Sequence, residues 1–205
     1  MLCVPRRLLY LVRHGETDWN AAERWQGHTD VPLNTTGRFQ ARAVAEALRP
    51  MRFSAVVASD LSRAQETARI VAAELGIAIA YFDAALRERS FGCFEGLTRE
   101  ECDRLHPEAW RAWLAERRPP AGAEGHESLT ARVVAAVARA AEDVARDDAP
   151  ALIVTHGGSL RAIVAAATGK LPGPVKNVAV WRVAWEEGLV GAEPVETEGE
   201  PLPET

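Results

Sequence analysis

Two short runs of consecutive apolar residues constrain the fold of this chain more than any other feature. Residues 8–12 read LLYLV, and residues 151–154 read ALIV. A strand with one face in water alternates apolar and polar residues, whereas a strand buried on both faces reads as a continuous apolar run. Strands of the second kind occur in parallel sheets that carry helices on both faces. The two runs therefore predict the centre of such a sheet.

Further strands and helices alternate along the rest of the chain. The predicted strands are 55–58, 77–82, 178–185 and 189–192, and the predicted helices are 35–49, 63–75, 98–117 with a break at Pro107, 129–144 and 159–168. Ser62 and Gln65 have the spacing of a capping box at the start of the second helix, and Gly76 follows its end. This alternation predicts one α/β domain over residues 1–192 with a mostly parallel sheet.

Charge and cysteine content exclude several classes of protein. The chain has 205 residues and a formal net charge of -5, and its last thirteen residues hold five glutamates and no basic residue. The rest of the chain has equal numbers of acidic and basic residues, which excludes a general nucleic-acid-binding surface. The acidic segment 193–205 predicts a disordered tail. No apolar run approaches the ~20 residues of a membrane span. Cys3, Cys93 and Cys102 form no C-x-x-C pair, which favours a cytoplasmic protein without disulfides.

Unusual polar residues follow the predicted strands at the points where these strands end. Arg13 and His14 come after the first strand, Arg63 opens the helix after the second, Glu88 follows the third, and His156 follows the run 151–154. In open α/β sheets, ligands bind beyond the carboxyl ends of the strands. Alone, each residue is compatible with a turn or a solvated surface. Their joint placement predicts one shared crevice.

The chemistry open to such a cluster is narrow. Guanidinium groups bind phosphate oxygens in a bidentate manner, and helix N-termini add amide donors. Neutral imidazole is a nucleophile near pH 7, and a carboxyl group can donate a proton. The five histidines show no metal-ligand spacing. The residues therefore predict phosphoryl transfer through a histidine, without a metal.

Two other catalytic patterns occur in the sequence, and we reject both. Residues 93–99 match C-x5-R, the pattern of cysteine phosphatases, but Glu95 would place a carboxylate inside the phosphate-binding loop, and no strand leads directly into Cys93. Gly157, Gly158 and Ser159 resemble a nucleophile elbow, but the final glycine of G-x-S-x-G is missing.

At these positions the sequence resembles the histidine phosphatase superfamily, in its phosphoglycerate mutase-like branch. The resemblance covers roughly residues 8–185. It rests on four ordered blocks and the short motifs between them, which are LVRHGETDWN at 11–20, QG at 26–27, DVPL at 30–33, Gly37, SDLSRAQETA at 59–68, LRERSFG at 86–92 with EG at 95–96, and THGG at 155–158 with Arg161. The fold that the resemblance implies is a three-layer α/β/α sandwich.

The resemblance also implies a role for each site residue. His14 is the expected nucleophile that becomes phosphohistidine, and Glu88 is the expected acid that protonates the leaving alcohol and then activates water. Arg13, Arg63 and His156 are expected to hold the phosphoryl oxygens. The supporting contacts that it implies are Asn20, Gln26, Gly27 and Gly157.

We therefore expect a metal-independent phosphatase that acts on small phosphate monoesters, with no partner from nucleic acid or membrane. The alternative is a phosphoglycerate mutase, an isomerase that shields the phosphohistidine from water. No metal or diffusible cofactor is implied, apart from a bisphosphate primer in the mutase. A non-catalytic binder of phospho-ligands is a third reading, but it has no use for a nucleophile and an acid together. The sequence leaves open the physiological substrate and the oligomeric state, a homodimer included.

Some positions depart from the pattern of the superfamily. Cys93 and Phe94 stand where many relatives carry a polar residue and Trp, and His126 interrupts what is often Gly-Glu-Ser. Arg117 and Arg118 faintly resemble the substrate-binding arginine pair of the mutases, but a solvated helix end, where cations suit the helix dipole, is the better explanation of them. Whether Cys93, His126 or this arginine pair contacts substrate is left open by the sequence.

Overall fold

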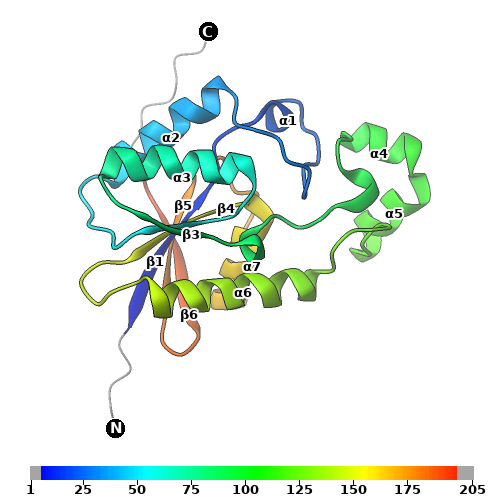
Figure 1. The fold of residues 1–205 in the computed structure, drawn as a ribbon. Helices are drawn as coiled ribbons and strands as arrows, with labels where there is room; N and C mark the ends of the chain where they lie inside the picture. Colours follow the sequence, from blue (N-terminus) through cyan, green and yellow to red (C-terminus); the bar gives the residue numbers. More distant parts are fainter. Residues whose placement is uncertain (1–5, 198–205) are drawn as a thin grey trace.

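The computed structural model describes residues 6–197 of the chain. Six strands form one sheet in the order β3-β2-β4-β1-β5-β6 (Figure 1). Their bounds are β1 (Arg7–Arg13), β2 (Val56–Ala58), β3 (Ile79–Phe82), β4 (Ala151–Thr155), β5 (Val180–Trp185) and β6 (Leu189–Val195). The strands from β3 to β1 pair in parallel, and β5 and β6 pair antiparallel. The predicted α/β fold with a mostly parallel sheet is confirmed.

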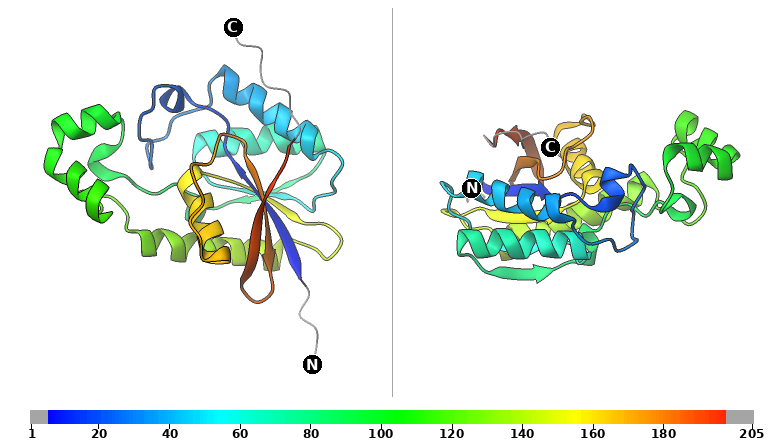
Figure 2. Two further views of the ribbon diagram at one scale, coloured as in Figure 1. Left: turned by 180° about the vertical axis from the view of Figure 1, so that it is seen from behind. Right: turned by 90° about the horizontal axis from the view of Figure 1, so that it is seen from above.

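Helices cover both faces of this sheet, which makes three layers (Figures 1 and 2). The helices α2 (Thr35–Leu48) and α3 (Ser62–Leu75) cover one face, and α6 (His126–Asp143) and α7 (Gly157–Thr168) cover the other. Successive side chains of strand β1 belong alternately to the two hydrophobic cores. Leu9 and Leu11 pack with α6 and α7, while Tyr10 and Val12 pack with α2 and α3. Burying such a side chain stabilises the fold by about 1.5–3 kcal/mol.

A smaller helical projection extends from the sandwich at the carboxyl end of the parallel strands. It contains α4 (Arg99–Leu105) and α5 (Pro107–Glu116), which lie away from the sheet in Figures 1 and 2. The predicted break at Pro107 is confirmed, because proline occupies the first turn of α5. The projection has its own aromatic core of Phe94, Trp110 and Trp113, against which Trp25 and Phe91 pack. The shorter elements are α1 (Asp18–Ala21), η1 (Ala84–Leu86) and η2 (Gly92–Phe94).

The capping box that the sequence predicts at the start of α3 is wrong. Leu61 precedes the helix and no side chain of α3 caps it. Instead, the carboxylate of Asp30 accepts hydrogen bonds from the backbone N–H (2.8 Å) and hydroxyl (2.7 Å) of Ser62. The Gln65 side chain donates to the carbonyl of Asp60. A carboxylate from a distant loop thus supplies the acceptor that a local pattern was expected to supply.

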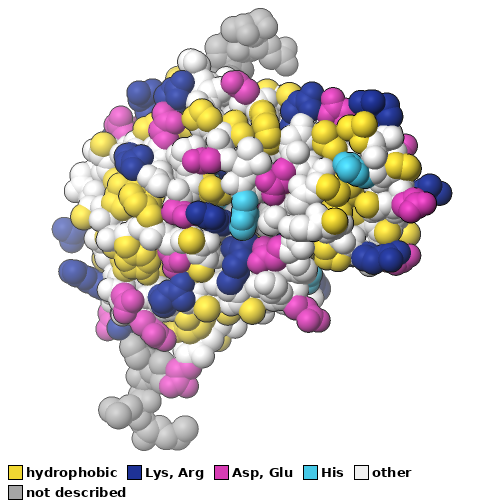
Figure 3. Space-filling view, turned by 45° about the vertical axis from the view of Figure 1, so that its right-hand side comes forward, with side chains coloured by type: hydrophobic (Ala, Val, Ile, Leu, Met, Phe, Trp, Pro, Cys, Tyr) yellow, Lys and Arg dark blue, Asp and Glu magenta, His cyan; other side chains and the backbone are white. Residues whose placement is uncertain are grey.

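The C-terminal boundary of the folded part also differs from the expectation. Residues Glu193–Val195, predicted to be disordered, belong to β6, because they pair with β5 residues and Glu193 forms an ion pair with Arg182. The rest of the predicted tail from residue 198, like Cys3, lies outside the described residues. Basic and acidic side chains are interspersed over the face in Figure 3. No helix within residues 6–197 has the length and apolar character to cross a membrane.

Candidate active site

A cavity of about 660 Å³ opens at the carboxyl end of the parallel strands. It lies where the loop after β1, the N-terminus of α7 and the first residue of α4 meet (Figure 1). The predicted site residues in its wall are Arg13, His14, Asn20, Gln26, Gly27, Arg63, Glu88 and Gly157. The topology therefore brings together residues from four separate segments of the chain, as the strand-end argument predicted.

His14 is buried, with 3% of its surface exposed, directly after β1. Its backbone N–H donates to the carbonyl of Thr155 at the end of β4 (2.9 Å). Its Nδ1 lies 2.7 Å from the carbonyl oxygen of Gly15. A carbonyl only accepts, so Nδ1 carries the proton and Nε2 keeps its lone pair. Burial, followed by the charges of Arg63 and Arg13, holds the pKa of His14 well below its usual value. The imidazole is therefore a neutral nucleophile at neutral pH.

Tight packing of glycines fixes the loop that carries His14. The N–H of Gly15 donates to the Thr67 hydroxyl of α3 (3.1 Å). A Cβ atom added to Gly15 would lie 2.4 Å from the carbonyl oxygen of Gly37, and one added to Gly37 would lie 2.1 Å from the carbonyl of Glu16. No side chain fits at either position, so the loop after β1 is held directly against the start of α2.

Arg63, the second residue of α3, is completely buried. It donates to the carbonyls of Thr29 (3.0 Å) and Gly27 (2.8 Å). Burial lowers its pKa to about 10, so the guanidinium stays charged at neutral pH. Arg13 donates to the carbonyl of Val175 (2.6 Å), and burial lowers its pKa as well. Buried Arg63 and half-buried Arg13 thus present two cations to one cavity.

Several buried polar atoms of the site have no hydrogen-bond partner. Within residues 6–197, such buried atoms include Nε of Arg13, Nε of Arg63, Nδ1 of His156 and Oε1 of Gln26. Buried polar atoms are nearly always satisfied in folded proteins. The two Nε atoms carry protons on cationic groups, so the ligand chemistry that satisfies them is anionic.

His156 lies behind His14 and not in the cavity wall. It is fully buried, its ring centroid is 5.0 Å from that of His14, and its Nε2 lies 2.8 Å from the Ser59 hydroxyl. Burial and the charge of Arg63 hold its pKa well below the usual value. The structure therefore places His156 beside the expected nucleophile in its neutral form.

The Glu88 carboxylate is held at the N-terminus of α7. Its Oε2 accepts from the backbone N–H of Gly158 (2.8 Å), and its Oε1 accepts from that of Arg89 (2.7 Å). A Cβ atom on Gly158 would lie 2.2 Å from Oε1 of Glu88. Gly158 is therefore a site residue that the sequence analysis did not include, since only a glycine lets the carboxylate approach this backbone.

The Glu95 carboxylate has an architectural role that explains its position after Cys93. It accepts from the backbone N–H groups of His28 (3.1 Å) and Thr29 (3.0 Å), in the loop whose carbonyls bind Arg63. Gly27 of that loop has a φ of 54°, and a Cβ atom there would lie 2.1 Å from Glu95. Cys93 packs against the aromatic core and does not line the cavity. The arrangement agrees with our rejection of the C-x5-R pattern.

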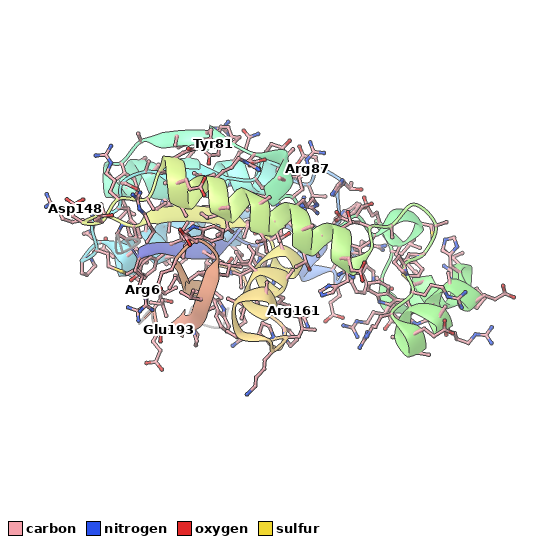
Figure 4. The ribbon with its side chains drawn as sticks, turned by 90° about the horizontal axis from the view of Figure 1, so that it is seen from below. Arg6, Tyr81, Arg87, Asp148, Arg161 and Glu193 are labelled. Carbon is pink, nitrogen blue, oxygen red and sulfur yellow. The ribbon has the colours of Figure 1, made fainter. Side chains whose placement is uncertain are left out.

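The other residues whose contact with substrate the sequence left open also lie outside the cavity wall. Arg117 and Arg118 are exposed at the end of α5, where Arg118 pairs with Glu116 (3.1 Å). His126 is the first residue of α6, and its Nδ1 accepts from Arg89 (3.0 Å). The wall instead contains Arg161 of α7 (labelled in Figure 4), which the resemblance included in its fourth block without a role. It also contains residues that sequence reasoning missed, among them Trp25, Phe91 and Val175. Apolar residues of this kind carry no local pattern that marks them as lining a site.

The part of the chain that the structure describes contains no group of three or more His, Cys, Asp or Glu side chains placed to hold a metal ion. The donor set of the cavity is dominated by arginines, which bind anions rather than cations.

Comparisons with known proteins agree with this geometry. Residues 9–188 match the Histidine phosphatase superfamily (branch 1). Phosphoglycerate mutase-like protein 4 of Arabidopsis thaliana is 41% identical over 159 residues, which are 76% of this chain and 68% of that protein. A probable phosphoglycerate mutase GpmB of Enterobacter sp. (strain 638) is 38% identical over 194 residues, 87% of this chain and 85% of the relative.

Solved structures show the same fold. YhfR of Bacillus stearothermophilus superposes with a TM-score of 0.81 at 32% identity, covering 95% of this chain and 98% of that one. A mycobacterial glucosyl-3-phosphoglycerate phosphatase in complex with VO3 gives a TM-score of 0.78 at 30% identity, covering 92% and 97%. The matched span includes every predicted site residue. The chain belongs to branch 1 of the histidine phosphatase superfamily.

Proposed function

We propose that the protein is a metal-independent phosphatase that hydrolyses small phosphate monoesters through a phosphohistidine at His14. One observation carries the proposal: a buried neutral imidazole, with its Nε2 lone pair free, lies in a cavity wall with buried Arg63 and half-buried Arg13, whose Nε atoms lack partners. Cations beside the nucleophile hold the phosphoryl group and keep the imidazole unprotonated at the same time.

The first step transfers the phosphoryl group to the protein. Nε2 of His14 attacks phosphorus, the bond between phosphorus and the ester oxygen breaks, and the carboxyl of Glu88 gives its proton to that oxygen. Arg13 and Arg63 stabilise the charge on the phosphoryl oxygens, and the N-terminus of α7 adds its dipole.

The second step returns the protein to its starting state. The Glu88 carboxylate takes a proton from water, the resulting hydroxide attacks phosphorus, and the bond between phosphorus and Nε2 breaks. Inorganic phosphate leaves, and both His14 and Glu88 regain their original protonation. The same carboxyl group therefore serves as acid and then as base.

A phosphoglycerate mutase is the second candidate, because sequence relatives carry that name. Arg117 and Arg118, which resemble the substrate-binding arginine pair of the mutases, are exposed and lie outside the cavity wall. This placement favours the phosphatase. The name of the mycobacterial structural relative also supports a phosphatase.

A phosphate-release screen in EDTA tests the proposed function. We expect the purified chain to release phosphate from at least one class among sugar phosphates, phosphoglycerates, nucleotides and riboside phosphates, at the same rate with and without chelator. Loss of turnover in EDTA that Mg²⁺ or Zn²⁺ restores would overturn metal independence. Tight binding without any release, in the presence of an intact His14, would point to the non-catalytic binder.

Substitution of the nucleophile separates histidine from cysteine chemistry. We expect His14→Ala to abolish the acid-labile phosphoenzyme and nearly all turnover, because no other cavity residue presents a neutral nucleophile. Cys93→Ser is the matched control and should keep most of the activity, since Cys93 does not line the cavity. An active His14→Ala with an inactive Cys93→Ser would reverse the assignment.

The fate of 3-phosphoglycerate distinguishes the two candidate activities. We expect release of phosphate to exceed conversion to 2-phosphoglycerate, because His14 lies in the wall of a cavity of about 660 Å³, which leaves room for water beside a small substrate. Both products are measured in one reaction, with and without the bisphosphate primer. Isomerisation that greatly outpaces hydrolysis in the presence of primer would establish the mutase instead.

Glu88→Gln tests the acid role through the leaving group. An alkyl ester such as 3-phosphoglycerate needs the proton, whereas p-nitrophenyl phosphate needs it little. We expect the variant to slow His14 phosphorylation by the alkyl ester by about 10²–10⁴-fold and by the aryl ester much less. Single-turnover phosphorylation is the proper measurement, because Glu88 also acts in the second step. Equal losses for the two esters would remove Glu88 from the acid role.

A further inference from the structure

The backbone that leads from η1 to Glu88 is held by side chains from other segments of the chain. Glu88 follows η1, and four consecutive carbonyls, those of residues 85–88, each accept a hydrogen bond from a side chain. The donors are Arg132, Thr155, Ser159 and His28. The position of the expected acid therefore depends on contacts from other parts of the fold.

Arg132 makes three of these six contacts. Its guanidinium donates to the carbonyls of Ala85 (2.9 Å), Arg87 (2.7 Å) and Glu88 (2.8 Å). Arg132 stands on α6, the helix that runs along the face turned toward the reader in Figure 4, with Arg87 labelled beside it. One rigid, planar guanidinium group thus binds three of the four backbone carbonyls of residues 85–88.

The guanidinium is itself fixed by a carboxylate. Both oxygens of Glu124 accept from Arg132, through Nε and Nη2, each at 2.7 Å. The two side chains are only 21% and 14% exposed. Glu124 neutralises the arginine locally, so the effect of Arg132 on Glu88 is mainly geometric. An ammonium group cannot reproduce this planar set of donors.

We propose that Arg132 is a positioning residue for the general acid: by holding the carbonyls of residues 85, 87 and 88, it sets where the Glu88 carboxyl meets the leaving oxygen. The proposal rests on the proposed function, in which Glu88 donates the proton. Arg132 holds the backbone side of Glu88, while Gly158 and Arg89 hold its carboxylate. A misplacement of about 1 Å can cost 10²-fold in rate.

Arg132→Gln tests the proposal by the same comparison of leaving groups. We expect single-turnover phosphorylation of His14 by 3-phosphoglycerate to fall by about tenfold or more, and phosphorylation by p-nitrophenyl phosphate to change by less than about threefold. Arg132→Lys, which keeps the charge and loses the fork, should show the same selectivity and serves as the second variant if the glutamine variant does not fold. Thermal denaturation establishes that each variant is folded at the assay temperature.

The matched control is Arg139→Gln, which lies about two turns beyond Arg132 on the same helix. Arg139 pairs with Asp83, and its side chain is 46% exposed. It should leave both rates unchanged. Combined with Glu88→Gln, Arg132→Gln should cause no further selective loss, because the acid is already gone.

Other outcomes would overturn the inference. Equal losses for both esters would make Arg132 a general structural residue, and unchanged rates would deny it any role. If Glu88→Gln is selective and the Arg132 variants are not, only the positioning role fails. If Glu88→Gln is itself unselective, the acid role in the proposed function fails, and the positioning role fails with it.

Discussion

The chemistry of this site depends on the hydrogen bond from Nδ1–H of His14 to the carbonyl of Gly15. This bond fixes the proton on the nitrogen that faces the backbone and leaves the other nitrogen free to attack. It also holds the ring in one orientation. The carbonyl is a fixed acceptor only because the loop cannot move, since Gly15 is packed against Gly37 of α2 and bonded to Thr67 of α3. In the proposed function, the packing of one helical layer on the sheet thus decides which nitrogen attacks phosphorus.

Burying Arg63 completely and Arg13 in part beside this imidazole costs free energy, because each loses hydration. The carbonyls of Gly27 and Thr29 offset part of that cost for Arg63, and Glu95 holds the loop that presents them. The Nε atoms of both arginines have no hydrogen-bond partner in the protein, so an anionic group is the ligand chemistry that suits this cavity. In the proposed function, that group is the phosphoryl group of the ester.

Sequence reasoning succeeded where local pattern and topology were sufficient. The apolar runs predicted the strands, and the strand ends predicted that His14, Arg63 and Glu88 meet. It failed where the partner was distant in sequence. The Ser62 N–H is capped by Asp30, 32 residues away, and the carbonyl of Glu88 accepts from Arg132, 44 residues away. Such contacts follow from the packing of complete elements, which no spacing rule describes.

The position of the phosphoryl group on His14 tests the account most directly. The phosphoenzyme, trapped by rapid mixing with p-nitrophenyl phosphate and kept at alkaline pH, is examined by phosphorus–nitrogen correlation NMR with ¹⁵N-labelled histidine. The account predicts phosphorus bonded to Nε2 of His14, because Nδ1 holds the proton that binds Gly15. Phosphorus on Nδ1, on His156 or on a cysteine would contradict it.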